Sequence, residues 1–253
     1  MGHLVSLIIP HTGRRVPCEQ CPLRPLETFR DFTAPEIKFV SHFKTGEMMA
    51  EPGAVIVSEG AHSAHLYTLL SGWAFRFKTL PDGRRQVLNY LLPGDLVGLQ
   101  GSVIGEMDHS VEALSSVVLC VFQRDRLDEL FGAHPGLGFD VTWLAAQEER
   151  MLDNHLLSLG RRTALERTAY LLSFLHERAL ALEMGKRVQI PINQQHVADT
   201  LGLSIVHTNK TLRKLTNMEL IRWLGGACEV LDLDGLMDVA GWEGLSRRKR
   251  PLI

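Results

Sequence analysis

Residues 194–215 read QQHVADTLGLSIVHTNKTLRKL and contain two short helical patterns separated by one glycine. Asn193 stands before the first pattern and Ser204 before the second, and both residue types cap helix N-termini. Gly202 lets the backbone adopt the left-handed conformation that a tight turn needs. The stretch therefore predicts two helices joined by a glycine turn, which is a helix-turn-helix.

The second of these helices has one face for a core and one for a partner. Thr208, Leu212 and Leu215 recur at helical spacing and share the face that packs inward. Aliphatic groups can contact thymine methyls, asparagine can bond adenine, and lysine or arginine can bind guanine or phosphate. We therefore predict that the outward residues enter a DNA major groove; they are Ser204, Ile205, Val206, Asn209, Lys210, Arg213 and Lys214. The alternative is a plain helical hairpin with a few exposed aliphatic side chains.

The segments on either side of this motif add a wing. Residues 188–192 alternate between apolar and polar types, as a β-strand does. Two short apolar runs flank Gly225-Gly226, which is a signal for a two-residue hairpin. We predict a winged helix-turn-helix domain over residues 161–245.

Upstream, residues 48–121 alternate between short apolar runs and turn signals. The signals are Pro52-Gly53, Ser71-Gly72, Pro81-Asp82-Gly83 and Pro93-Gly94. Their regular spacing predicts an antiparallel roll or barrel, with a plain β-sandwich as the alternative. We expect a roll over residues 28–135, preceded by an arm of residues 1–27 rich in Pro, Arg and Cys. The fold class is then α+β.

Between roll and wing, residues 136–160 predict one long helix. Its apolar residues recur at helical spacing; they include Val141, Leu144, Ala145, Met151, Leu152, Leu156 and Leu159. Such a stripe needs a partner, and a second copy in a coiled coil would supply one, so we predict a homodimer. The alternative is that the stripe packs back on its own roll.

Composition limits the partners of the 253-residue chain. Its formal net charge is −2, so no global field attracts nucleic acid, and DNA binding requires a local basic patch. No apolar run approaches the roughly 18 residues of a membrane span. The N-terminal sequence lacks the features of a signal peptide. We therefore expect a cytoplasmic protein with no membrane partner, whose four cysteines stay reduced.

Residues 246–253, SRRKRPLI, form a basic tail. Arg247, Arg248, Lys249 and Arg250 could contribute phosphate contacts to DNA, because backbone contacts depend on local positive charge. The competing interpretation is a disordered, solvated end.

With these parts in order, residues 28–240 resemble the Crp/Fnr family of bacterial transcription regulators. The resemblance is carried by SEGAHSAHLYTLLSGWAFRF and LPGDLVG in the roll, the long helix, and INQQHVADTLGLSIVHTNKTLRKL. It implies a cyclic-nucleotide-binding-type roll, a dimerisation helix and a winged helix-turn-helix that binds a two-fold symmetric operator. RNA polymerase is a further partner that the resemblance implies.

The roll departs from members of this family that bind cyclic AMP. Those members place a Gly-Glu pair after the PGDxxG strand and an Arg-Ser pair soon after. Here Gly98 is followed by Leu99 and Gln100, and His109-Ser110 stands in the Arg-Ser place. A buried anion without its arginine loses charge-assisted hydrogen bonds, so we expect no control by cyclic AMP.

Oxygen-sensing members carry C-x2-C-x5-C in the arm and one roll cysteine, which together hold a [4Fe–4S] cluster. Cys18 and Cys21 match the first two positions and Cys120 the roll cysteine, whereas Glu27 stands third in the arm. The resemblance suggests these three cysteines as iron–sulfur ligands beside a carboxylate. A thiol switch between Cys18 and Cys21, a haem, and plain reduced cysteines are the alternatives, and the effector stays unknown.

The sequence gives little support to an enzyme. A cupin-like metal site usually presents an HxH pair, whereas His62 and His65 are three residues apart and would point to opposite faces of a strand. The chain contains no P-loop, GxSxG or HExxH motif. We expect a transcription regulator and not an enzyme.

Overall fold

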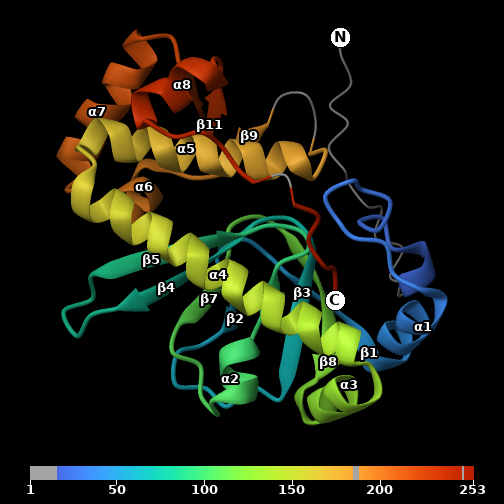
Figure 1. The fold of residues 1–253 in the computed structure, drawn as a ribbon. Coiled ribbons are helices and arrows are strands. Elements are labelled where there is room, and N and C mark those ends of the chain that lie inside the picture. Colours follow the sequence, from blue (N-terminus) through green and yellow to red (C-terminus); the bar gives the residue numbers. More distant parts are fainter. Residues whose placement is uncertain (1–15, 185–187, 247) are drawn as a thin grey trace. The chain divides into compact units, whose positions relative to one another are not determined.

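A computed structural model describes residues 16–184, 188–246 and 248–253 (Figure 1). These residues form two compact units, which are described separately. The roll unit contains residues 16–78, 91–149 and 248–253. The C-terminal unit contains residues 79–90, 150–184 and 188–246. The first part of the predicted arm, residues 1–15, and Arg247 lie outside the described residues.

The β-structure upstream of the long helix consists of two four-stranded sheets. Their strand orders are β1-β8-β3-β6 and β2-β7-β4-β5. The strands are β1 (Lys44–Ala50), β2 (Val55–Val57), β3 (His65–Ser71), β4 (Ala74–Thr79), β5 (Arg85–Leu91), β6 (Leu96–Val97), β7 (Ser110–Ala113) and β8 (Val117–Gln123). The two central pairs, β3 with β8 and β4 with β7, are antiparallel, which confirms the predicted roll and leaves no closed barrel.

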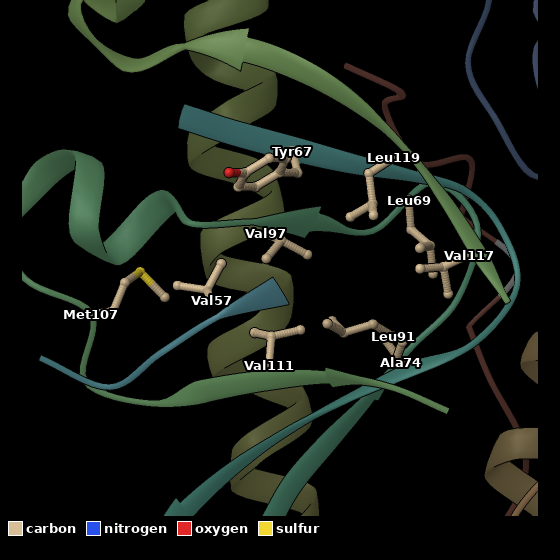
Figure 2. Packing of buried hydrophobic residues seen from close by; sticks show 11 residues of the cluster. Val57, Tyr67, Leu69, Ala74, Leu91, Val97, Met107, Val111, Val117 and Leu119 are labelled. Carbon is tan, nitrogen blue, oxygen red and sulfur yellow. The ribbon is translucent and has the colours of Figure 1, made fainter. Parts of the chain in front are cut away.

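The core of the roll unit follows from the two-residue period of its strands. Alternate residues of β3 and β8 point to the same side, so Leu69 and Leu119 are fully buried together with Val111 of β7. Figure 2 shows these side chains in one cluster with Tyr67 and Val97. Burial of each such aliphatic side chain stabilises the fold by about 1.5–3 kcal/mol.

Short helices complete this unit. Helix α1 (Ala34–Phe43) begins at a capping box: the Thr33 side chain accepts a hydrogen bond from the backbone N–H of Glu36, and the Glu36 carboxylate accepts one from the N–H of Thr33. The remaining elements are η1 (Cys18–Gln20), α2 (Leu99–Val103), η2 (Arg124–Arg126) and α3 (Leu127–Ala133).

The long helix α4 spans Pro135–Arg161 and confirms the predicted helix. Its apolar residues do not form one uniform stripe. Leu137 and Val141 are buried within the roll unit, in line with the alternative interpretation of the sequence. Leu152 and Leu156 are 37% and 70% exposed, so the second half of the helix leaves apolar surface uncovered.

The C-terminal unit combines four helices with a small sheet of order β10-β11-β9. Its helices are α5 (Ala164–Ala181), α6 (Gln194–Leu201), α7 (Ile205–Asn217) and α8 (Leu233–Ala240). Its strands are β9 (Gln189–Ile190), β10 (Ile221–Leu224) and β11 (Ala227–Val230). Helix α5 packs against α7 and α8. Throughout the described ranges, no helix is long and apolar enough to cross a membrane.

The tail requires a correction. Residues 251–253 are buried in the roll unit, and the guanidinium of Arg250 is paired with Asp95 at 2.8 Å. Residues 250–253 are therefore not a disordered end. The expectation that Arg250 is free to bind DNA phosphate is also wrong, because its charge is already neutralised by a carboxylate.

Candidate nucleic-acid interface

Local hydrogen bonds set the ends of α6 and α7. The Asn193 side chain accepts from the N–H of His196 at 2.9 Å, and the Asn193 N–H donates to the ring of His196 at 3.1 Å. Burial lowers the pKa of His196, which favours the neutral ring that can accept this bond. Gly202 has φ of 60°, and the Ser204 hydroxyl accepts from the N–H of His207. The predicted caps and glycine turn are confirmed.

The inner face of α7 is as predicted, and α6 also buries one of its faces. Val197 and Leu201 of α6 are buried, as are the three inward residues of α7, Thr208, Leu212 and Leu215. Thr211 is buried too and donates to the carbonyl of His207, a contact that the sequence pattern did not indicate. Burial of this face fixes which side chains α7 presents to solvent.

The outer face of α7 carries all seven predicted DNA-binding residues, and each is exposed. Val206 is 76% exposed and Ile205 is 40% exposed, so two aliphatic side chains stand in water at the start of the helix. Within the described ranges, Lys210 and Arg213 form no ion pair, which leaves their charges available to phosphates or base edges. The face thus combines apolar, amide and cationic groups at the start of one helix.

The predicted wing is a tight hairpin between β10 and β11. Gly225 and Gly226 have φ of 50° and 97°, the pair of positive values that a type I′ turn requires. Arg222 donates from Nε to the carboxylate of Glu229 at 3.0 Å across the hairpin. This ion pair links the two strands of the wing and gives the Arg222 guanidinium an anionic partner.

Helix α6 has a support that sequence reasoning missed. In the C-terminal unit the hydroxyls of Tyr90 and Thr200 lie 2.8 Å apart, and the Gln86 amide donates to the carbonyl of Thr200 at 2.9 Å. Arg85 pairs with Asp199 at 3.5 Å. Burial raises the pKa of Tyr90, so its hydroxyl stays protonated and able to donate.

Comparisons with known proteins agree with this geometry. Residues 47–134 match the model of the cyclic nucleotide-binding domain, and residues 166–239 match the Crp-like helix-turn-helix domain. The nitrogen fixation regulation protein FixK of Bradyrhizobium diazoefficiens is 31% identical over 216 residues, which cover 85% of this chain and 90% of FixK. The chain belongs to the Crp/Fnr family of transcription regulators.

Two further comparisons extend the match over the length of this Crp/Fnr regulator. The transcriptional activator protein FnrL of Cereibacter sphaeroides is 26% identical and covers 94% of this chain and 95% of FnrL. The solved structure of FixK2 from Bradyrhizobium japonicum has a TM-score of 0.67 at 26% identity, and covers 76% of this chain and 96% of FixK2. The relatives named here are regulators, and nothing among them supports the cupin-like enzyme alternative.

The cysteines of the regulator share one charged neighbour. Cys18 in η1 and Cys120 on β8 are buried, Cys21 is half-buried, and the charge of Lys44 acts on both buried thiols. The Lys44 ammonium donates to the carbonyl of Val16 at 2.9 Å and to the Glu47 carboxylate at 2.6 Å. A buried ion pair thus holds the arm beside the thiols.

The described residues present no preformed set of ligands for a four-iron cluster. Burial raises the pKa of the Cys18 thiol and raises that of Cys120 to about 12, so both thiols stay protonated at neutral pH. Glu27, the residue in the fourth ligand place, is exposed. Among the residues that the structure describes, no three His, Cys, Asp or Glu side chains gather as metal ligands.

His109 stands at the place of the Arg-Ser pair of cyclic-AMP-binding members, and its environment keeps it uncharged. Burial, with Arg76 and Lys78 nearby, lowers the pKa of His109 to about 4, so its ring is neutral at pH 7. Arg76 is 5% exposed and pairs with Glu148 of α4 at 2.6 Å. Arg76 therefore already has an anionic partner.

Proposed function

We propose that this Crp/Fnr regulator binds a two-fold symmetric operator in double-stranded DNA as a homodimer. One α7 helix of each copy lies in a major groove, and the wing hairpin lies beside it. The proposal rests on the outer face of α7, where two aliphatic residues, Asn209 and three basic residues are exposed around a buried inner face. The DNA lies in the bacterial cytoplasm, where we place the regulator, and RNA polymerase stays a predicted further partner.

The exposed half of α4 supports the homodimer. Leu152, Leu156 and Leu159 line an apolar groove of about 280 Å³ in the C-terminal unit, together with Leu171 and Leu201. Leucines at helical spacing lose contact with water when an identical helix packs against them. A second α4 would cover this surface and place two α7 helices on the two halves of a symmetric site.

The contacts of Arg76 and His109 in the roll support the proposal that cyclic AMP does not control this regulator. A cyclic phosphate needs a free cation, whereas Arg76 is held by Glu148 and His109 is neutral. An incoming anion would have to displace the Glu148 carboxylate before it could bind. The effector and the sign of regulation are not assigned by these contacts.

Selection of bound fragments from random DNA tests the function directly. The full-length protein is expected to enrich one inverted repeat, and Lys210→Ala with Arg213→Ala is expected to abolish the enrichment. Lys38→Ala removes an exposed charge in α1, away from every residue proposed to bind DNA, and is the matched control, which should enrich the wild-type repeat. Failure of the wild-type protein to enrich any symmetric sequence would contradict the proposal.

The cysteine arrangement gives a separate prediction. Protein expressed and purified without oxygen in iron-replete medium is expected to be colourless and free of iron, because the described cysteine, histidine and carboxylate side chains form no preformed group of metal ligands. Absorption spectroscopy and metal analysis measure both properties. A brown protein whose colour is lost in Cys120→Ala would instead establish the cluster that the cysteine pattern suggests.

A further inference from the structure

Backbone hydrogen bonds join the segment of residues 248–253 to residues 28–30, just after the arm. The N–H of Arg250 donates to the carbonyl of Thr28 at 2.8 Å, and the N–H of Arg30 donates to the carbonyl of Arg250 at 2.8 Å. Phe29 and Arg250 thus form a parallel β-bridge. Backbone pairing of this kind recognises an extended peptide whatever its side chains are.

The side chain of Arg250 adds a specific contact. Its Nη2 donates to the carbonyl of Gly94 and to the carboxylate of Asp95, both at 2.8 Å, and its guanidinium lies 5.6 Å from the ring centroid of Phe29. Gly94 has φ of 89°, and a Cβ there would lie 2.5 Å from the Phe29 ring. The turn before Asp95 can approach Phe29 this closely only because residue 94 is a glycine and has no Cβ.

The residues after Arg250 fill an apolar surface. Leu252 and Ile253 are 4% and 6% exposed, and Pro251 is also buried. The hydroxyl of Thr68 on β3 donates to the carbonyl of Ile253. A buried apolar pair, a paired arginine and a bonded backbone together distinguish this segment from a solvated end.

We propose that the roll unit carries a groove for an extended peptide of the type Arg-Pro-apolar-apolar. Its occupant is the chain's own segment of residues 250–253, which acts as a strap (Figure 1). The strap follows the C-terminal unit in the chain, where the N–H of Leu245 donates to Glu177 at 2.6 Å. Because the groove and its occupant belong to the same chain, the covalent tether favours docking by its effective concentration.

Hydrogen exchange of the full-length protein tests the strap without any reference to DNA. Leu252→Ser with Ile253→Ser removes the apolar anchor but keeps every basic residue of the tail. We expect the amides of Arg30 and Arg250 to exchange at least about tenfold faster in this variant. Lys249→Ser, which loses one exposed charge, is the matched control and should keep the wild-type rates. The Leu245 amide should stay protected in all three proteins.

Addition of a peptide then tests the groove itself. A synthetic RKRPLI peptide in excess is expected to restore slow exchange at Arg30 of the double variant, whereas the same peptide with Arg250→Ala is expected not to do so. Exchange of the Arg250 amide at the free-chain rate in the wild-type protein would overturn the proposal. Equal protection by the two peptides would overturn the recognition of arginine by Asp95.

Discussion

Replacement of Leu152 and Leu156 by glutamate is expected to convert the regulator from a dimer to a monomer. Both side chains are exposed in the single chain, so the substitution leaves the monomer core filled while it places charges in the α4 pairing surface. A monomer reaches only one half-site. Because linked binding gains a factor of about 10²–10⁴, operator affinity should fall by that order.

Light scattering and fluorescence anisotropy on a two-half-site duplex measure the two effects together. Leu80→Glu is the matched control, since Leu80 is 53% exposed and lies outside α4. The control should remain a dimer with the affinity of the wild-type protein. Dimers of unchanged affinity in the Leu152→Glu, Leu156→Glu variant would show that α4 does not pair the copies.

The DNA-binding motif was predictable because its determinants are local. Asn193, Gly202 and Ser204 each act within four residues of their own position, through a cap or a turn. The inner face of α7 follows from helical spacing alone. Such features depend on neighbours in the chain, so one sequence is enough to place them.

The support of α6 and the strap depend on distant parts of the chain. Tyr90 and Thr200 are 110 residues apart in the sequence, and Thr68 and Ile253 are 185 apart. The helical and strand periodicities of the sequence do not predict which residues so far apart will contact one another. The basic residues of SRRKRPLI predicted that this segment lies in solvent or contacts phosphate. The structure differs because Pro251, Leu252 and Ile253 are apolar and become buried.

The cysteines show a different limit of sequence reasoning. The C-x2-C pair and Cys120 are close enough to affect one another electrostatically, although the described side chains form no group of metal ligands. The spacing did not reveal that Lys44 lies beside them and pairs with Glu47. The chemistry of the thiols therefore depends on a residue outside the motif.

Val206→Glu is expected to change the base that the regulator reads. Val206 stands 76% exposed on the first turn of α7 and offers only methyl groups, which favour contact with a thymine methyl. A carboxylate at the same place accepts a hydrogen bond from the cytosine amino group. We therefore expect a T·A pair opposite Val206 in the wild-type operator, and a shift toward C·G in the variant. Selection from random DNA with both proteins measures the shift.

Two further variants separate base reading from loss of fold. Val206→Thr keeps one methyl group and should retain the preference for T·A, so it is the matched control. Asn209→Ala removes an amide that can form two hydrogen bonds to adenine. The preference for adenine at one neighbouring position of the operator should therefore fall by about 1–3 kcal/mol. Because Asn209 and Val206 are both exposed, neither change empties the core beneath α7. The same selected motif from the wild-type protein and Val206→Glu would mean that this side chain reads no base.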